Sequence, residues 1–375
     1  MSGRRLFIPG YFAGFTNSRI SLELAVGLAH LTGRILAPYR FRVPLRASAP
    51  LRAEQFEKPL ALIPDLFEIP VPWSNEYLEE RRLPEPDALT CEWAEDLCDS
   101  LFYLNADDLP DDEFCRAFRN GRSHAYRFDR RQNDAADLHI KGEILGYYCH
   151  FFYLNDRQRQ EVIALMKRLQ PKREYREFAD RIACSFGRFN AIHLRRGDFV
   201  STRFTPRAAH ITGDEIVANL ASRMDPDIPL IICTDGSPQE KIFGPIRSHF
   251  RKTLFLDSYL EEESRFRKEL ANLPVNDQIV RALVSQLVAS QAEVFAGTLY
   301  STFTALIHRQ RGFAARTPNF LYCYSDFDSA SVPFDECEFL PVGEGPFSWN
   351  RTRYPVPPCM YSWLREWPES FDPTL

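Results

Sequence analysis

The chain opens with short apolar runs that alternate with a helical pattern. Residues 5–9 are predicted to form a strand, residues 10–17 a glycine-containing loop, residues 20–32 a helix and residues 34–37 a second strand. Leucines and alanines recur along one face of the predicted helix, and Gly33 follows as a stop signal. This order predicts a βαβ unit at the start of the chain.

A more regular alternation follows a charged helix predicted at residues 157–169 and a break at Pro171. Apolar runs predict strands at residues 191–194, 230–234, 253–256 and 293–296. Helical patterns between and after them predict helices at residues 213–224, 237–250, 275–290 and 301–310. Repeated strand–helix units are typical of doubly wound parallel sheets, which bind ligands at the carboxyl ends of their strands. Neither the stretch from about residue 38 to the charged helix nor the segment after residue 326 shows a clear periodicity.

Two adjacent arginines end the apolar run at residues 191–194, where the sequence reads AIHLRRGDF from residue 191 to residue 199. An interior strand that ends in Arg195 and Arg196 needs a polar partner, and guanidinium groups bind diphosphates through paired hydrogen bonds. The alternative is a surface loop in which the arginines pair with Asp198. This segment alone leaves both interpretations open.

Two further segments carry candidate binding groups. The strand that ends at Gly297 precedes a helix, so the backbone amides of Ser301, Thr302 and Phe303 are expected at a helix N-terminus, where they can hold phosphate or can be capped by the hydroxyls. In the first loop, Gly14 lets the backbone pass close to a ligand. Asn17 is expected either to cap the following helix, in competition with Ser18, or to contact a sugar.

Composition narrows the function classes. The length of 375 residues suits two domains, and 46 basic against 51 acidic residues give a net charge of −5, which disfavours bulk binding to nucleic acid or an anionic membrane. Nine dispersed cysteines without a CxxC pair indicate reduced thiols, with Cys233 as a core residue. We find neither a signal peptide nor a membrane-spanning run, which predicts a cytoplasmic protein unless a targeting segment has been removed.

The three candidate segments, in this order, resemble those of fucosyltransferases that use GDP-fucose. HLRRGDF resembles the family's His-x-Arg-Arg motif, GFTNSR its first glycine loop, and FAGTLYSTFT its strand–helix segment. The resemblance covers the opening βαβ unit and most of residues 190–312. It implies an α/β, GT-B-like fold with two Rossmann-like domains facing a central cleft. The expected parts are residues 1–170 on the acceptor side, residues 171–325 for the nucleotide sugar, and a tail at residues 326–375 that packs back on the first domain.

The resemblance also implies an activity and site residues. The reaction is an inverting transfer of L-fucose from GDP-fucose to a glycan or a Ser/Thr hydroxyl, with no cofactor and no metal. Arg195 steadies the departing GDP and Asn17 faces the sugar, while Asp198 and Glu23 are candidates for the base, although a lone Glu within a helix usually faces solvent. The expected donor-binding residues are Gly14, Phe15, His193, Arg195, Arg196, Asp235, Ser285, Ser301, Thr302 and Phe303.

Two departures from the family pattern leave alternatives open. Ser285 stands where the family often has an Asp that pairs with guanine, and Asp277 is expected instead to cap its own helix with Asn276. Ala13 stands where some members carry a Glu that could act as the base. The alternatives are therefore a transferase for a different nucleotide sugar on the same fold, or a catalytically silent protein that binds a GDP-sugar.

Overall fold

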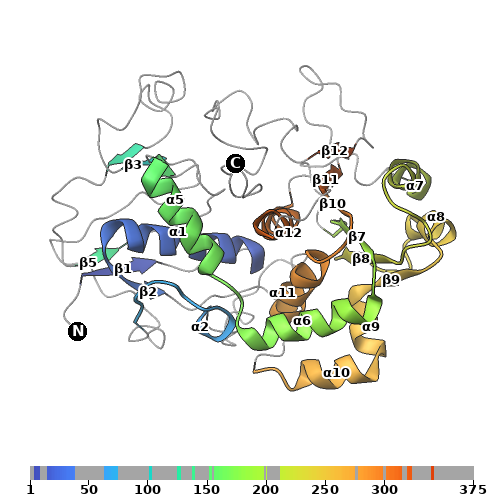
Figure 1. Cartoon of the computed structure of the whole chain (residues 1–375), viewed down its shortest axis with the longest axis horizontal. Helices are drawn as coiled ribbons and strands as arrows, with labels where there is room; N and C mark the ends of the chain where they lie inside the picture. The colour runs from blue at the N-terminus through green and yellow to red at the C-terminus, as the bar shows by residue number, and fades with distance from the viewer. Residues whose placement is uncertain are drawn as a thin grey trace, which may run out of the picture. The chain divides into compact units, whose positions relative to one another are not determined.

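The fold is known from a computed structural model of the chain (Figure 1), which describes part of its length. The described residues are 4–8, 15–38, 63–74, 101–103, 125–127, 137–139, 152–153, 156–197, 200, 212–274, 278–298, 301–314, 319–322 and 339–341. They fall into two compact units, one with the described residues up to Lys172 and one with those from Arg173 onward.

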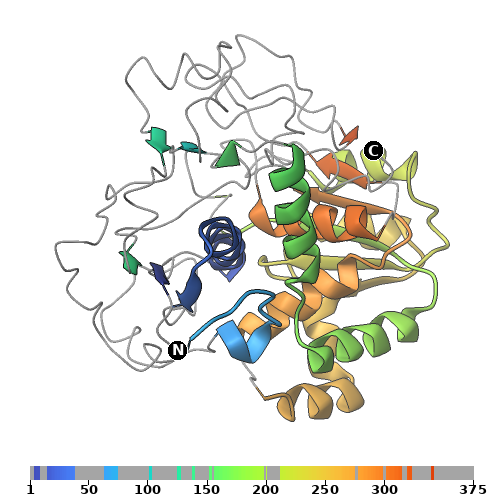
Figure 2. The same ribbon diagram turned by 60° about the vertical axis from the view of Figure 1, so that its left-hand side comes forward.

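The first unit begins with the predicted βαβ arrangement. Strand β1 (Arg5–Ile8), helix α1 (Phe15–Thr32) and strand β2 (Ile35–Pro38) follow one another, and β1 pairs in parallel with both β2 and β5 (Asp137–His139). Figure 2 shows α1 end-on beside β1 and β2. The other described elements of this unit are α2 (Ile63–Leu66), α5 (Asp156–Arg168) and a parallel sheet in the order β4 (Ala125–Arg127), β3 (Leu101–Tyr103) and β6 (Phe152–Tyr153).

Helix α1 starts earlier than the sequence pattern predicts. It begins at Phe15, whose buried ring stacks on that of Phe67 with 6.4 Å between the ring centroids. Asn17 and Ser18 therefore lie inside the helix, and the expectation that either residue caps it is wrong. The predicted stop at Gly33 is confirmed, because Gly33 has a φ of 63° and closes a Schellman motif in which Arg34 N–H donates to the Ala29 carbonyl.

The second unit is built on a six-stranded sheet in the order β12-β11-β10-β7-β8-β9. Only β12 runs antiparallel to its neighbour. The strands are β7 (Asn190–Leu194), β8 (Leu230–Thr234), β9 (Thr253–Phe255), β10 (Phe295–Thr298), β11 (Asn319–Tyr322) and β12 (Phe339–Pro341). The predicted parallel strands are confirmed, and β8 has the predicted bounds, whereas β10 begins two residues later than expected.

Helices lie on both faces of this sheet, as the doubly wound pattern predicts (Figure 1). On one face, α7 (Gly213–Ala221) and α8 (Phe243–His249) pack their apolar residues against alternate positions of β7 and β8. The remaining helices are α6 (Arg173–Phe186), α9 (Leu256–Glu262), α10 (Ser264–Ala271), α11 (Gln278–Ala289) and α12 (Thr302–Phe313). Of these, α6, α9 and α10 were not predicted.

A buried arginine joins α12 to the segment between α11 and β10. Arg311 is 0% exposed, and its guanidinium donates to the backbone carbonyls of Ser290, Ala292 and Glu293. These carbonyls follow the end of α11, where the helix itself offers no donors. Arg311, near the C-terminal end of α12, therefore holds in place the segment that leads from α11 into β10.

The two cysteines whose state the structure describes, Cys184 and Cys233, are both free thiols. Cys233 is buried in β8 as predicted, and burial raises the pKa of its thiol well above the usual range. Among the described helices, none combines the length and the apolar character needed to cross a membrane.

Candidate functional site

The strand order of the second unit places its candidate site. From β7 the chain proceeds to β8 and β9 on one side, and then crosses back to add β10 on the other side of β7. The carboxyl ends of β7 and β10 therefore flank the point at which the strand order reverses, which is where open α/β sheets bind ligands. Arg195 follows β7 and Ser301 follows β10, so the two predicted anion-binding segments of this unit meet at the same edge.

Threonine hydroxyls form hydrogen bonds that join the carboxyl end of β7 to both neighbouring strands. Thr298 on β10 donates to the His193 carbonyl at 3.0 Å and accepts from the Arg195 backbone N–H at 3.0 Å. On the other side, Thr234 on β8 donates to the Leu194 carbonyl at 2.7 Å. The backbone that carries the Arg195 side chain is thus held from both sides. The sequence analysis did not single out either threonine.

The two adjacent arginines have different carboxylate partners. Nη1 of Arg195 lies 3.0 Å from Oδ2 of Asp235, and the two side chains are 25% and 28% exposed. Arg196 is buried, and its Nε lies 3.0 Å from Oε2 of Glu240. The ion pairs therefore tie both arginines to the loop after β8, and the less buried guanidinium is that of Arg195.

The loops after β7 and β8 pack so closely on each other that each contains a glycine with no room for a Cβ. A Cβ at Gly197 would collide with the Asp235 carboxylate, and one at Gly236 would meet both the Glu240 carboxylate and the Arg196 stem. Oδ1 of Asp235 also accepts from the Arg196 backbone N–H at 2.7 Å. The Asp235 carboxylate is thereby fixed through both of its oxygens.

His193 lies under this edge as a neutral imidazole. Burial lowers its pKa from 6.5 to about 3, with smaller contributions from the positive charge of Arg195 and from His308. Its Nδ1 is 2.8 Å from the Thr304 hydroxyl, and its ring lies against that of Phe303 with 4.5 Å between centroids. His193 therefore connects β7 to the first turn of α12 and adds no positive charge to the site.

Helix α12 begins next to the arginines, as predicted. Ser301 is its N-cap residue, but the Ser301 side chain makes no capping hydrogen bond, so capping by this hydroxyl is not what the structure shows. Helix geometry leaves the first amides, at Thr302 and Phe303, outside the intrahelical pattern. Gly297 lets β10 approach the helix, because a Cβ there would collide with Thr304.

Ser285 lies within α11 and is 6% exposed. Asn276 and Asp277 fall outside the described residues, as do Asp198, Ala13 and Gly14. The prediction that an Asn276–Asp277 cap precedes this helix therefore stays a prediction, and so does the pairing of the arginines with Asp198.

The remaining predicted residues belong to the first unit. Glu23 is 1% exposed and its Oε1 lies 3.4 Å from Nε of Arg19, whose guanidinium in turn covers the ring of Phe67. The expectation that Glu23 faces solvent is wrong, because α1 is buried on nearly all sides. Phe15 is also buried, and Asn17 is helical in its backbone. Their roles in donor binding and catalysis stay predictions.

The second unit thus brings together groups that could hold an anion. Arg195 supplies a fork of N–H donors, and the start of α12 supplies backbone amides with the positive end of a helix dipole. Such a pair suits a diphosphate, whose charge is spread over several oxygens. Among the described residues, no group of three or more His, Cys, Asp or Glu side chains is placed to hold a metal ion.

Comparison with solved structures returns fucosyltransferases at low similarity. A NodZ α-1,6-fucosyltransferase soaked with GDP-fucose matches with a TM-score of 0.49 and 13% identity, over 90% of this chain and 99% of that one. The fucosyltransferase NodZ from Bradyrhizobium gives 0.48 and 12%, over 87% and 98%. POFUT1 in complex with GDP-fucose gives 0.43 and 12%, over 86% and 98%. No protein-family model and no curated protein matches the sequence.

Proposed function

We propose that the chain is a glycosyltransferase that moves L-fucose from GDP-fucose to a hydroxyl of a glycan or of a Ser/Thr side chain. The observation that carries this proposal is the position of Arg195, which follows β7 at the reversal of strand order, next to the start of α12. Two of the three sequence motifs on which the resemblance to GDP-fucose transferases rests, HLRRGDF and FAGTLYSTFT, contribute to this edge. A GT-B-like arrangement of two domains about a cleft is part of the proposal.

The proposed chemistry is an inverting displacement. The acceptor oxygen forms a bond to the anomeric carbon of fucose while the bond from that carbon to the β-phosphate oxygen breaks, and the acceptor proton passes to a base or to water. GDP leaves with an additional negative charge, which Arg195 and the amides of Thr302 and Phe303 stabilise without a metal. His193 stays neutral and supports the first turn of α12 from below.

The test is GDP release from GDP-fucose in the presence of glycan and peptide acceptors. We expect Arg195→Ala to lower turnover by about 10²–10³-fold, the range seen when one donor to a developing anion is removed. Arg195→Lys keeps the charge but loses the fork, so we expect it to recover only part of the activity. Undiminished turnover in Arg195→Ala would refute the mechanism.

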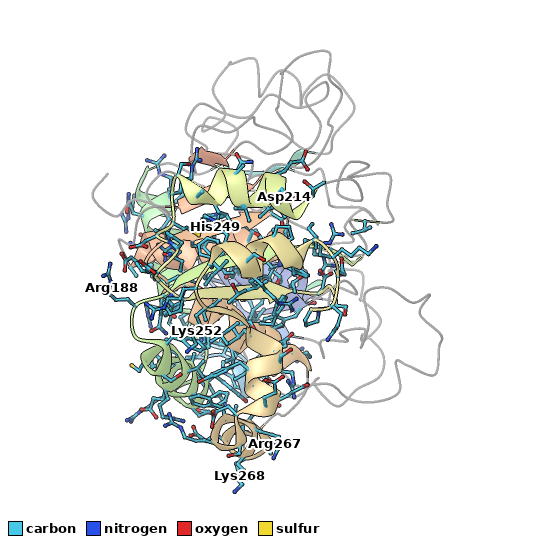
Figure 3. The ribbon with its side chains drawn as sticks, turned by 90° about the vertical axis from the view of Figure 1, so that its right-hand side faces the viewer. Arg188, Asp214, His249, Lys252, Arg267 and Lys268 are labelled. Carbon is cyan, nitrogen blue, oxygen red and sulfur yellow. The ribbon has the colours of Figure 1, made fainter. Side chains whose placement is uncertain are left out.

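Arg188→Ala is the matched control, because Arg188 is also paired with a carboxylate but precedes β7 and so lies at the opposite edge of the sheet. Its guanidinium binds Glu293 at 2.8 and 2.9 Å. Figure 3 shows Arg188 pointing outward from the ribbon. We expect this variant to keep the turnover of the wild-type protein.

A second candidate is a transferase that uses another nucleotide sugar. The observation in its favour is Ser285, a neutral hydroxyl on a buried position of α11, at which the resemblance implies an Asp that would give guanine two charged contacts. Thermal-shift measurements with GDP, UDP and ADP separate the two candidates. A larger shift with UDP or ADP than with GDP would favour the second one, whereas binding of GDP-fucose without transfer or hydrolysis would indicate a silent binding protein.

A further inference from the structure

The carboxylate of Asp235 occupies a position that the proposed function does not explain. It lies at the edge where an anion is expected, and Oδ2 is 3.0 Å from Nη1 of Arg195. A negative charge beside the proposed diphosphate site weakens the attraction for an anion. If Arg195 served only as a positive charge, Asp235 would oppose its function.

The contacts of Asp235 show how the carboxylate is held. Oδ1 accepts from the backbone N–H of Arg196 at 2.7 Å, and Gly197 leaves the space that Oδ2 fills. Asp235 follows β8, whose Thr234 is bonded to the end of β7. The carboxylate is therefore part of the rigid sheet edge and is not a mobile surface group.

A rigid carboxylate gives the guanidinium a direction. Arginine has a long side chain with several rotatable bonds, and the ordering of such a chain costs conformational entropy. Asp235 accepts from the Nη1 end of the planar fork, and this restrains the directions in which the other N–H groups point. The pair is partly exposed, so an anion can reach the guanidinium while the carboxylate stays in place.

We propose that Asp235 is a positioning residue for Arg195, which orients the guanidinium toward the leaving diphosphate at the expense of anion affinity. This inference rests on the proposed function for its catalytic part. Its structural part, the restraint of Arg195 in the ligand-free protein, stands on the ion pair alone.

The substitution Asp235→Asn separates orientation from charge. An amide can accept from Arg196 N–H through its oxygen, but its NH₂ group then faces Nη1 of Arg195, donor against donor. We expect inorganic pyrophosphate to bind roughly two- to five-fold more tightly by calorimetry, because an opposing partly exposed charge is gone. With GDP-fucose we expect KM to fall or to stay unchanged and kcat to fall by about 10- to 100-fold, because the guanidinium is no longer aimed. A merely structural role would not separate the two constants in this way.

The orientation of Arg195 can also be measured without any ligand. Phenylglyoxal modifies accessible guanidinium groups, and peptide mapping by mass spectrometry reports the rate at Arg195. We expect this rate to rise in Asp235→Asn and to stay unchanged in Glu293→Gln, which removes the same charge at the opposite edge of the sheet, where Glu293 binds Arg188. An unchanged rate at Arg195 in Asp235→Asn, or weaker or unchanged binding of pyrophosphate, would overturn the inference.

Asp235→Glu provides the test if the asparagine variant does not fold, as judged by circular dichroism and a thermal melt. It keeps the charge but moves it by one methylene, so we expect pyrophosphate affinity within about two-fold of wild type and a lower kcat. Equal losses of pyrophosphate affinity and of kcat in Asp235→Glu would overturn the inference. If wild-type protein binds pyrophosphate but does not release GDP from GDP-fucose, the proposed function fails while the pyrophosphate and phenylglyoxal results still decide the role of Asp235. Wild-type protein that does not bind pyrophosphate would overturn the inference itself.

Discussion

Replacement of Thr298 by valine is expected to destabilise the second unit by about 3 kcal/mol. The hydroxyl is buried and makes two hydrogen bonds, one to the His193 carbonyl and one from the Arg195 backbone N–H. Valine has nearly the same shape, so no cavity forms, but the Arg195 N–H loses its partner, and the His193 carbonyl loses the hydroxyl and keeps only its bond in the β7–β10 ladder. A buried polar group left without a hydrogen bond costs about 1–3 kcal/mol, and the loss of one ordinary hydrogen bond costs about 0.5–1.5 kcal/mol, so the two together give the expected value.

Scanning calorimetry is a suitable assay, because the two units can unfold in separate transitions. For a domain of this size we expect the transition of the second unit to fall by roughly 6–12 °C. Thr298→Ser keeps the hydroxyl and loses only a methyl group, so it should lie much closer to wild type. A Thr298→Val transition within about 2 °C of wild type, or a serine variant less stable than the valine variant, would refute the idea that this hydroxyl holds the strand end.

Three further predictions concern the same unit. Burial lowers the pKa of His193 from 6.5 to about 3 in the folded protein. As the pH falls below 6.5, the imidazole is therefore protonated in the unfolded chain but stays neutral in the folded one, which favours unfolding. We expect urea unfolding to show a stability loss of about 1.4 kcal/mol per pH unit below about pH 6.5 that is absent in His193→Gln. Gly197→Ala should lower the melting temperature, because its Cβ collides with Asp235, whereas Gly244→Ala, with nothing within 4 Å of its Cβ, should not. Arg311→Leu should lower the free energy of unfolding by about 3–5 kcal/mol in chemical denaturation, because three backbone carbonyls lose the buried guanidinium that donates to them. A loss below about 1 kcal/mol would contradict that role.

The sequence predicts the parallel sheet well because its strands are short, apolar and fully buried. All five positions of β7 and the first four of β8 are buried, so a continuous apolar run marks each strand without any knowledge of its neighbours. The same argument places Arg195 at a strand end. By contrast, α6 was missed although Tyr175, Phe178 and Ile182 recur at helical spacing, because charged residues dominate the segment.

Other features depend on contacts between distant residues. The early start of α1 follows from the packing of Phe15 on Phe67, 52 positions later in the sequence. The partner of Arg195 depends on the pairing of β7 with β8, which brings Asp235 beside a residue 40 positions away. An aspartate after a strand is a recognisable signal, but its choice of arginine becomes clear only when the strands are aligned.

The order of the strands also bears on when the site forms during synthesis. A nascent chain that ends at β9 already contains Arg195, Arg196, Asp235 and Glu240, and it can pair β7 with β8 and β9 through local connections. It contains neither Thr298 nor α12, which arrive about a hundred residues after β7 and complete the sheet through non-local contacts, the slower kind to form. A ligand that bridges Arg195 and the start of α12 therefore binds only the finished sheet, and its binding energy would resist the detachment of β10 from β7.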